Sequence, residues 1–187
     1  MNSEPTHVTS NGFKLMPLAT LIQMKANQLK KPQLMKSPFP CMVAKASLRA
    51  NWPPIYNQGS IGSCTANALC SCFRFMNRKK KFEPSRLYTY YIERKHMMRG
   101  GEIYDSGAFV ADGCELARTK GLCAEYLYPY NVDKVNDDPP EYCDSDAYWH
   151  KCGASYAITT DALNSVRSCI CKGEPVMLAF GVYRSFS

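Results

Sequence analysis

The sequence predicts an α+β protein that is mostly helical. Four stretches place apolar residues at the three- and four-residue spacing of a buried helix face. One further stretch, residues 175–183 (PVMLAFGVY), has the β-branched and aromatic composition of a strand. With 187 residues, 45% of them hydrophobic, the chain can form one domain with a sizeable core or part of a larger two-lobed unit.

Start signals and apolar spacing mark the first two helices. The first is predicted to begin near Ser63, and its buried stripe comprises Ala66, Leu69, Phe73 and Met76. The second follows Pro84 and Ser85, residue types that are typical of a helix N-terminus. Its core-facing residues are Leu87, Tyr88, Tyr91 and Ile92.

Glycines mark the ends of the third and fourth helices. The third is predicted to follow residues 105–107 and to end at Gly121, and the fourth to run from a cap at Asp161 to Gly173. Their apolar residues are Val110, Leu116 and Ala117 in the third, and Leu163, Val166 and Ile170 in the fourth. Between them, residues 128–156 are rich in proline, aspartate and tyrosine and predict a long ordered loop.

The N-terminal part differs in composition from the rest. Residues 1–48 contain prolines among lysines and polar residues, which predicts an arm or pro-segment-like extension preceding a folded domain over residues 49–187. The first ten residues (MNSEPTHVTS) lack the basic and apolar regions of a secretory signal, and no stretch reaches the roughly 18 apolar residues of a membrane span. We therefore expect an intracellular protein without a membrane span.

The formal net charge of +7 is concentrated in three clusters: lysines within residues 25–36, the run at residues 78–81, and Arg94, Lys95 and Arg99. The last two clusters follow predicted helices, where cations complement the exposed carbonyls and the helix dipole. A basic patch alone is a weak signal for nucleic acid, and we do not expect nucleic acid as a partner.

Ten cysteines raise the question of zinc or disulfides. The close pairs, residues 70/72 and 169/171, have C-x-C spacing, whereas structural zinc sites use C-x-x-C pairs, and the three histidines are scattered. The sequence therefore predicts no metal site and no cofactor. Most of these cysteines are expected to be reduced, buried, small apolar residues.

Cys64 stands in a different setting from the other cysteines. A glycine-rich loop, residues 57–63 (NQGSIGS), leads directly to it, and it opens the strongest helical pattern of the chain. The positive end of a helix dipole lowers the pKa of a thiol. The amide of Gln58, six residues earlier, and the Cys64 backbone N–H could form an oxyanion hole. The pattern favours a nucleophile over an inert core thiol, a disulfide or a metal ligand.

The segment from Gln58 to Cys64 (QGSIGSC) resembles the active-site segment of the papain-like cysteine peptidases, the cathepsin family. The resemblance covers about residues 48–187 and continues through FEPSRLYTYYIERK, DSGAFVADGCELARTKGLCAEYLYPY and TTDALNSVRSCICKGEPVMLAFGVYRSF. The segments GSCTANA and PPIYNQG look closest to members from bacteria and large DNA viruses; for a viral source, virion association would fit.

This resemblance implies a papain-like two-lobe fold, of which the chain is mostly the α-helical left lobe with the start of the β-rich right lobe. It implies that Cys64 is the nucleophile, that Gln58 is the oxyanion donor, and that Ser106 and Gly107 line the groove for a peptide or protein substrate. Two positions depart from the family pattern. Ile61 replaces a disulfide cysteine, and Thr65 replaces an aromatic residue, which leaves the substrate preference open.

The family's general base, a histidine oriented by an asparagine, has no counterpart at the matching place, and we therefore expect the domain to be incomplete at its C-terminus. His7, His96 and His150 lie elsewhere and are expected to be surface residues. The sequence thus predicts a cysteine-type peptidase that acts through a thioester acyl-enzyme, seen without its base-bearing lobe. The alternative is an inactive relative that serves as a peptide-binding or scaffold protein.

Overall fold

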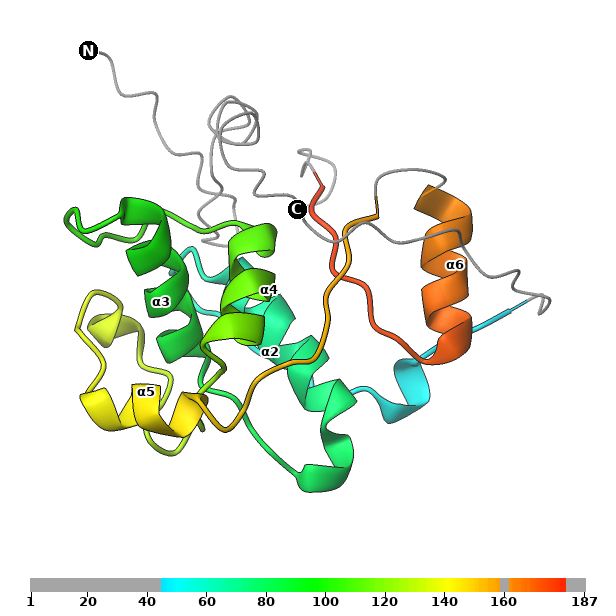
Figure 1. The fold of residues 1–187 in the computed structure, drawn as a ribbon, viewed down its shortest axis with the longest axis horizontal. Helices are drawn as coiled ribbons and strands as arrows, with labels where there is room; N and C mark the ends of the chain where they lie inside the picture. Colours follow the sequence, from blue (N-terminus) through cyan, green and yellow to red (C-terminus); the bar gives the residue numbers. More distant parts are fainter. Residues whose placement is uncertain (1–44, 159–161, 181–187) are drawn as a thin grey trace, which may run out of the picture.

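Three helices, α2 (Cys64–Met76), α3 (Arg86–Met98) and α4 (Val110–Thr119), pack against one another in pairs at the centre of the structure. The computed structural model describes residues 45–158 and 162–180. Within these ranges a short 3-10 helix, η1 (Arg49–Asn51), precedes α2, and a second, η2 (Arg78–Lys80), follows it. Figure 1 shows the three central helices, with α5 below α3 and α6 set apart on the opposite side.

Helix α2 begins where its sequence predicts. Ala66, Leu69 and Phe73 are buried and form its inner stripe. Met76 was expected in the same stripe, but the structure corrects this, because its side chain is 54% exposed in the last residue of the helix. Just before α2, Trp52 stacks on Phe75 with ring centroids 4.9 Å apart and so anchors the η1 segment to the helix.

Helix α3 begins with the predicted serine cap. The Ser85 hydroxyl oxygen accepts a hydrogen bond from the Tyr88 backbone N–H at 3.1 Å and donates to the Tyr128 carbonyl oxygen at 2.6 Å. One side chain thus satisfies a free N–H of the first helical turn and ties the segment after α4 to the start of α3.

Helix α4 ends just before Gly121, a position that leaves no space for a Cβ. Gly121 has φ +96°, and its N–H donates to the Leu116 carbonyl oxygen at 3.0 Å. A glycine in this left-handed conformation is a common way to end an α-helix. A Cβ at this position would lie 1.8 Å from the Ala147 carbonyl oxygen. The end of α4 therefore packs directly on the backbone at the end of α5.

The region over residues 128–156 is not only a loop, which corrects the sequence prediction. It contains a 3-10 turn, η3 (Val132–Lys134), and a helix, α5 (Glu141–Ala147). Cys143 and Ala147, four residues apart, are both completely buried and attach α5 to the core. The two prolines before α5 and the acidic residues in its first turn are the usual marks of a helix start.

Helix α6 (Ala162–Lys172) and the segment after it differ from the predictions in their packing. The predicted cap, Asp161, lies outside the described residues. Ser165, Ser168 and Cys169 form the buried face, whereas Leu163 is 72% exposed. The predicted strand does not form over residues 174–180, because no described segment pairs with it; residues 181–183 lie outside the described part. The extended backbone is visible beside α4 in Figure 1.

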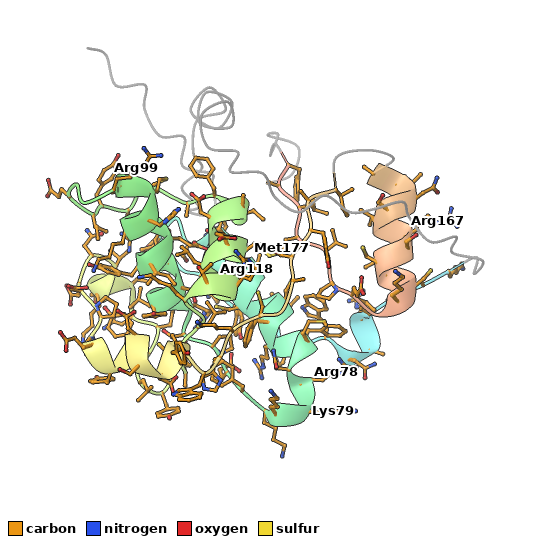
Figure 2. All side chains as sticks on the ribbon, in the orientation of Figure 1. Arg78, Lys79, Arg99, Arg118, Arg167 and Met177 are labelled. Atoms are coloured by element: carbon orange, nitrogen blue, oxygen red, sulfur yellow. The ribbon has the colours of Figure 1, made fainter. Side chains whose placement is uncertain are left out.

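Among the described residues, the core consists of two clusters that share the central helices. The first gathers around the tyrosines and aliphatic side chains of α3, including Leu87, Tyr88, Tyr90 and Ile92. The second joins Leu69, Cys70 and Phe73 of α2 to Ala117 and Leu122, and Met177 packs against it. Figure 2 shows Met177 beside the central helices, while Arg78 and Lys79 project from the far end of α2. No helix in residues 45–158 or 162–180 is both long and apolar enough to span a bilayer.

Arg94 corrects the interpretation of the third basic cluster. It is completely buried, unlike Lys95 and Arg99 beside it. Its guanidinium donates to the Tyr104 carbonyl oxygen at 3.0 Å, to Asn136 Oδ1 at 2.8 Å and to the Val135 carbonyl oxygen. Arg94 therefore fastens two loops to α3 instead of contributing to a basic surface.

Replacement of Gly121 by alanine tests the contact between the end of α4 and the end of α5. We expect Gly121→Ala to lower the free energy of unfolding by about 2 kcal/mol or more, because the new Cβ meets backbone atoms and φ is positive. Gly153→Ala is the control, since a Cβ there meets nothing within 4 Å. Urea unfolding of both variants measures the difference, and equal stabilities would contradict the contact.

Candidate functional site

Cys64 occupies the first residue of α2 and is exposed. The other free cysteines among the described residues are buried or half-buried. Its neighbours on both sides, Ser63 and Thr65, are buried, so Cys64 is the exposed residue at this point of the turn. This placement combines accessibility with the unpaired N–H groups of a helix start.

The loop that leads to Cys64 is held by the hydroxyl of Tyr130. This hydroxyl donates to the Gln58 carbonyl oxygen at 2.8 Å and lies 2.6 Å from Ser63 Oγ. Asn67, one turn into α2, donates its amide to both the carbonyl oxygen and the Oγ of Ser63 at 2.9 Å. Both ends of the loop, at Gln58 and at Ser63, are therefore fixed by one tyrosine.

Arg86 supports Tyr130 from the start of α3. Its guanidinium lies 3.8 Å from the centroid of the Tyr130 ring and 3.1 Å from the Asn57 carbonyl oxygen. It also pairs with Glu125, 3.4 Å away, and Glu125 accepts the Tyr130 backbone N–H at 2.9 Å. Stacking and charge-assisted hydrogen bonds thus converge on the ring that holds the loop.

Asp105 and Tyr90 join the loop to the predicted groove wall. Asp105 Oδ1 accepts the Gly62 N–H at 2.9 Å and the Tyr90 hydroxyl at 2.6 Å. The same hydroxyl accepts the Gly107 N–H at 2.9 Å. A Cβ on Gly62 would lie 3.3 Å from the Gly107 nitrogen, so the two backbones approach closely. The structure therefore brings Ser106 and Gly107 next to Gly62, the loop residue two positions before Cys64.

Gln58 and Ser106 make hydrogen bonds within their own turns. Gln58 Nε2 donates to the Ile61 carbonyl oxygen at 3.1 Å, which orients the amide along the loop. Ser106 Oγ donates to the Gly107 carbonyl oxygen at 3.0 Å, and Gly107 adopts φ +77°. Since the Gly107 N–H is already donated to Tyr90, the groups of this wall that remain for a ligand are mainly acceptors.

The pKa of Cys64 is raised, which differs from the sequence expectation. Partial loss of hydration around the thiol is the main cause, and the carboxyl of Glu93 adds to it. The backbone N–H groups of Thr65 and Cys64 act in the expected direction and lower the pKa, but they do not outweigh burial. In the described structure Cys64 is therefore a thiol near neutral pH.

Glu93 is the buried carboxyl next to this turn. It lies on α3 and is completely buried, and Thr65 Oγ1 donates to its Oε2 at 2.7 Å. Burial raises the pKa of Glu93 to about 8, against a lowering by the Thr65 hydrogen bond. Its other oxygen, Oε1, has no hydrogen-bond partner in the described structure. Glu93 is thus mostly neutral at pH 7.

No histidine in the described ranges is among the groups that act on Cys64. His150 stacks on Phe82 with ring centroids 4.0 Å apart and lies 3.7 Å from Asp146, while His96 is exposed on α3. His7 lies outside the described residues. The described site therefore holds a candidate nucleophile and hydrogen-bond donors without a candidate base.

The cysteine predictions are confirmed for the core positions and wrong for Cys171. Cys70, Cys123 and Cys169 are free and buried, as expected of small apolar residues. Cys171 is disulfide-bonded, which the expectation of reduced thiols did not include.

Sequence reasoning missed the residues that position the site: Tyr90, Glu93, Asp105 and Tyr130. Each acts from a segment distant in sequence, up to 72 residues away in the bond between Tyr130 and Gln58. The sequence contained one clue to these residues. Glu93 directly follows the apolar residues of α3, and an ionisable side chain is unusual on a buried helix face.

No protein-family model matches the chain. Over 142 residues it is 30% identical to an uncharacterized peptidase C1-like protein of Acanthamoeba polyphaga mimivirus. The matched region covers 70% of this chain and 45% of that relative. The chain therefore spans less than half the length of this relative.

Solved structures of cysteine proteases share the fold. Xylellain, a cysteine protease from Xylella fastidiosa, superposes with a TM-score of 0.61 and 26% identity, over 92% of this chain and 67% of that one. Digestive procathepsin L 3 from the larval midgut of Tenebrio molitor has a TM-score of 0.55 and 14% identity, over 79% and 49% of the two chains. The second likeness concerns the fold alone.

Removal of the Tyr130 hydroxyl tests the support of the loop. Tyr130→Phe should lower the free energy of unfolding by about 1–2 kcal/mol, because the Gln58 carbonyl oxygen loses its donor. Tyr126→Phe removes a hydroxyl from a tyrosine that is 79% exposed and should leave stability unchanged. Urea unfolding compares the two variants, and equal losses would show that the hydroxyl does not hold the loop.

Glu93→Gln should change the pH dependence of stability. The folded pKa of Glu93, about 8, lies above its ordinary value of 4.5, so the unfolded chain loses this proton first and wild-type stability falls between about pH 4.5 and 8. Glutamine cannot ionise. The stability of Glu93→Gln relative to wild type should therefore rise by about 5 kcal/mol across this window. A difference independent of pH, measured by urea unfolding, would contradict a neutral buried carboxyl.

Proposed function

We propose that this chain, which is similar in sequence to a peptidase C1-like protein and in fold to papain-like cysteine proteases, is the nucleophile-bearing lobe of a cysteine-type peptidase. The observation that carries this proposal is Cys64, an exposed thiol at the first residue of α2 among buried neighbours. The substrate is a peptide or protein chain, and the reaction is acyl transfer to the thiol followed by hydrolysis.

In this mechanism the Cys64 thiolate attacks a peptide carbonyl carbon, and the carbonyl oxygen becomes an oxyanion. The Cys64 backbone N–H and the Gln58 side-chain amide would stabilise that charge. One Gln58 amide hydrogen is directed to the Ile61 carbonyl oxygen, which leaves the second for the oxyanion. The carbon–nitrogen bond then breaks, the amine leaves with a proton, and water hydrolyses the thioester.

The groove wall would bind the substrate backbone next to the thiol. Ser106 and Gly107 lie beside the loop through Asp105 and Tyr90. Since the Gly107 N–H is engaged, we propose that its carbonyl oxygen accepts an N–H of an extended substrate. The second lone pair of this oxygen remains after the bond from Ser106 Oγ.

Activation of the thiol needs a charge that the described residues do not supply. The pKa of Cys64 is raised by burial and by Glu93, and an adjacent imidazolium is the usual means of lowering it. The same imidazole would protonate the leaving amine. We propose that a second, base-bearing lobe provides this group; the chain spans 45% of its mimivirus relative, whose remaining length offers room for such a lobe.

The raised pKa of Cys64 also favours a second candidate function. A thiol that stays protonated, without an imidazole among the described residues, suits a catalytically inactive relative that keeps the groove as a peptide-binding or scaffold surface. The two candidates differ in whether addition of a base-bearing lobe creates peptidase activity.

Peptide hydrolysis by two chains separates the candidates. The chain of 187 residues should label at Cys64 with an electrophile but hydrolyse a fluorogenic peptide at a rate close to background. A chain completed with a histidine- and asparagine-bearing lobe should gain about 10²–10⁴-fold from general acid–base catalysis. Cys64→Ala in the completed chain should abolish this gain.

Two outcomes would contradict the proposal. Hydrolysis by the 187-residue chain that Cys64→Ala removes would mean that a base is already present, with His96 and His150 as the residues to replace. No hydrolysis by any folded, completed chain would leave the scaffold function as the better account.

A further inference from the structure

Glu93 is a buried acid that the proposed mechanism does not use. It is completely enclosed between α3, α2 and α4, where charged side chains are rarely found without a partner. Oε2 is held by the Thr65 hydroxyl at 2.7 Å, and Oε1 has no hydrogen-bond partner in the described structure. Gly113 of α4 leaves the space for Oε1, since a Cβ there would lie 2.3 Å from it.

No cation neutralises this carboxyl within the described residues. Arg94 is the nearest basic residue in sequence, but its guanidinium is committed to Tyr104, Val135 and Asn136. Asp112 adds negative charge from α4 and is itself faced by His96 and Arg99. The titratable groups that interact with Glu93 are Cys64 and Cys70 on α2, Asp112 and Cys114 on α4, and Arg94 on α3.

We propose that Glu93 is a positioning residue for Cys64: it holds the first turn of α2 through Thr65, and only its neutral form is compatible with a Cys64 thiolate. The inference rests on the proposed role of Cys64 as the nucleophile. Thr65 connects the two groups, because its hydroxyl donates to Glu93 while its backbone N–H lowers the pKa of the neighbouring Cys64 thiol.

The direction of the effect follows from two acids that share a poorly hydrated region. A negative charge on either one opposes ionisation of the other. A proton on Glu93 removes its contribution to the pKa of Cys64, so that the N–H groups of Cys64 and Thr65 are opposed by burial alone. Loss of that proton creates a carboxylate, which raises the pKa of Cys64 and so opposes the effect of these N–H groups. The pKa of Glu93, about 8, brings this change into the range where a cysteine nucleophile works.

The pH dependence of Cys64 alkylation in the 187-residue chain tests this inference. The rate of iodoacetamide labelling at Cys64 is followed from pH 6.5 to 10 by peptide mapping, which distinguishes it from the less exposed thiols. Glu93→Gln keeps the shape and the acceptor for Thr65 but removes the charge. Its rate profile should move to lower pH, and labelling at pH 8.5 should be at least about threefold faster than in wild type.

Glu102→Gln is the matched control, because Glu102 is an exposed glutamate in the loop after α3. It should leave the profile of Cys64 unchanged. A Glu93→Gln profile identical to that of wild type and of Glu102→Gln would overturn the inference, even with an altered stability. A purely structural residue would change stability without moving the profile.

Thr65 provides a second variant pair if Glu93→Gln does not fold. Thr65→Val removes the hydroxyl that favours the carboxylate, so Glu93 keeps its proton to higher pH and the Cys64 profile should again move to lower pH. Thr65→Ser retains the hydroxyl and should restore the wild-type profile. Equal profiles for valine and serine at residue 65 would overturn the inference as well.

The alkylation experiment is independent of peptide hydrolysis. If a completed chain fails to hydrolyse peptides, the proposed peptidase activity fails, while a shifted Cys64 profile in Glu93→Gln still establishes the coupling. If the completed chain is active but the profiles coincide, the peptidase stands and the function assigned to Glu93 fails.

Discussion

The hydroxyl of Tyr130 is the contact on which the site depends. It holds the Gln58 carbonyl oxygen and Ser63 Oγ together, and these two residues bracket the turn that delivers Cys64 to the surface. The tyrosine is in turn fixed by Arg86 at the start of α3 and by Glu125 after α4. The starts of two helices and a later segment therefore meet at one ring, and the position of the thiol follows from their packing.

The described residues fix the geometry around Cys64 but do not supply the charge that would ionise its thiol. The loop, the start of α2 and the adjacent wall at Ser106 and Gly107 are held by hydrogen bonds among the described residues. The charge that would ionise Cys64 is not among them, and burial together with Glu93 works against ionisation. If Cys64 is the nucleophile proposed above, its ionisation requires a positively charged group beside it.

The sequence predicted the helices well because their apolar spacing and caps are local signals. Cys64 at the start of α2, Ser85 as a cap and Gly121 as a terminus depend on residues within one or two turns. Helix α5 was missed because its buried face consists of only Cys143 and Ala147 within an acidic stretch.

The errors concern features that depend on distant parts of the chain. The strand expected after Gly173 needs a neighbouring strand, which the described segments do not provide. The buried state of Arg94 depends on carbonyl oxygens 10 and 41 residues later. The pKa of Cys64 is raised first by burial and then by Glu93, 29 residues away in sequence, and no local pattern could reveal either cause.

The stack of Trp52 on Phe75 gives the protein two distinct optical reporters. Trp52 is partly enclosed against α2, and its emission depends on that contact, whereas Trp149 after α5 is 79% exposed and emits from an aqueous environment. Because the protein has only these 2 tryptophans, a red shift confined to the shorter-wavelength component would signal detachment of the segment before α2 while the helical core remains folded.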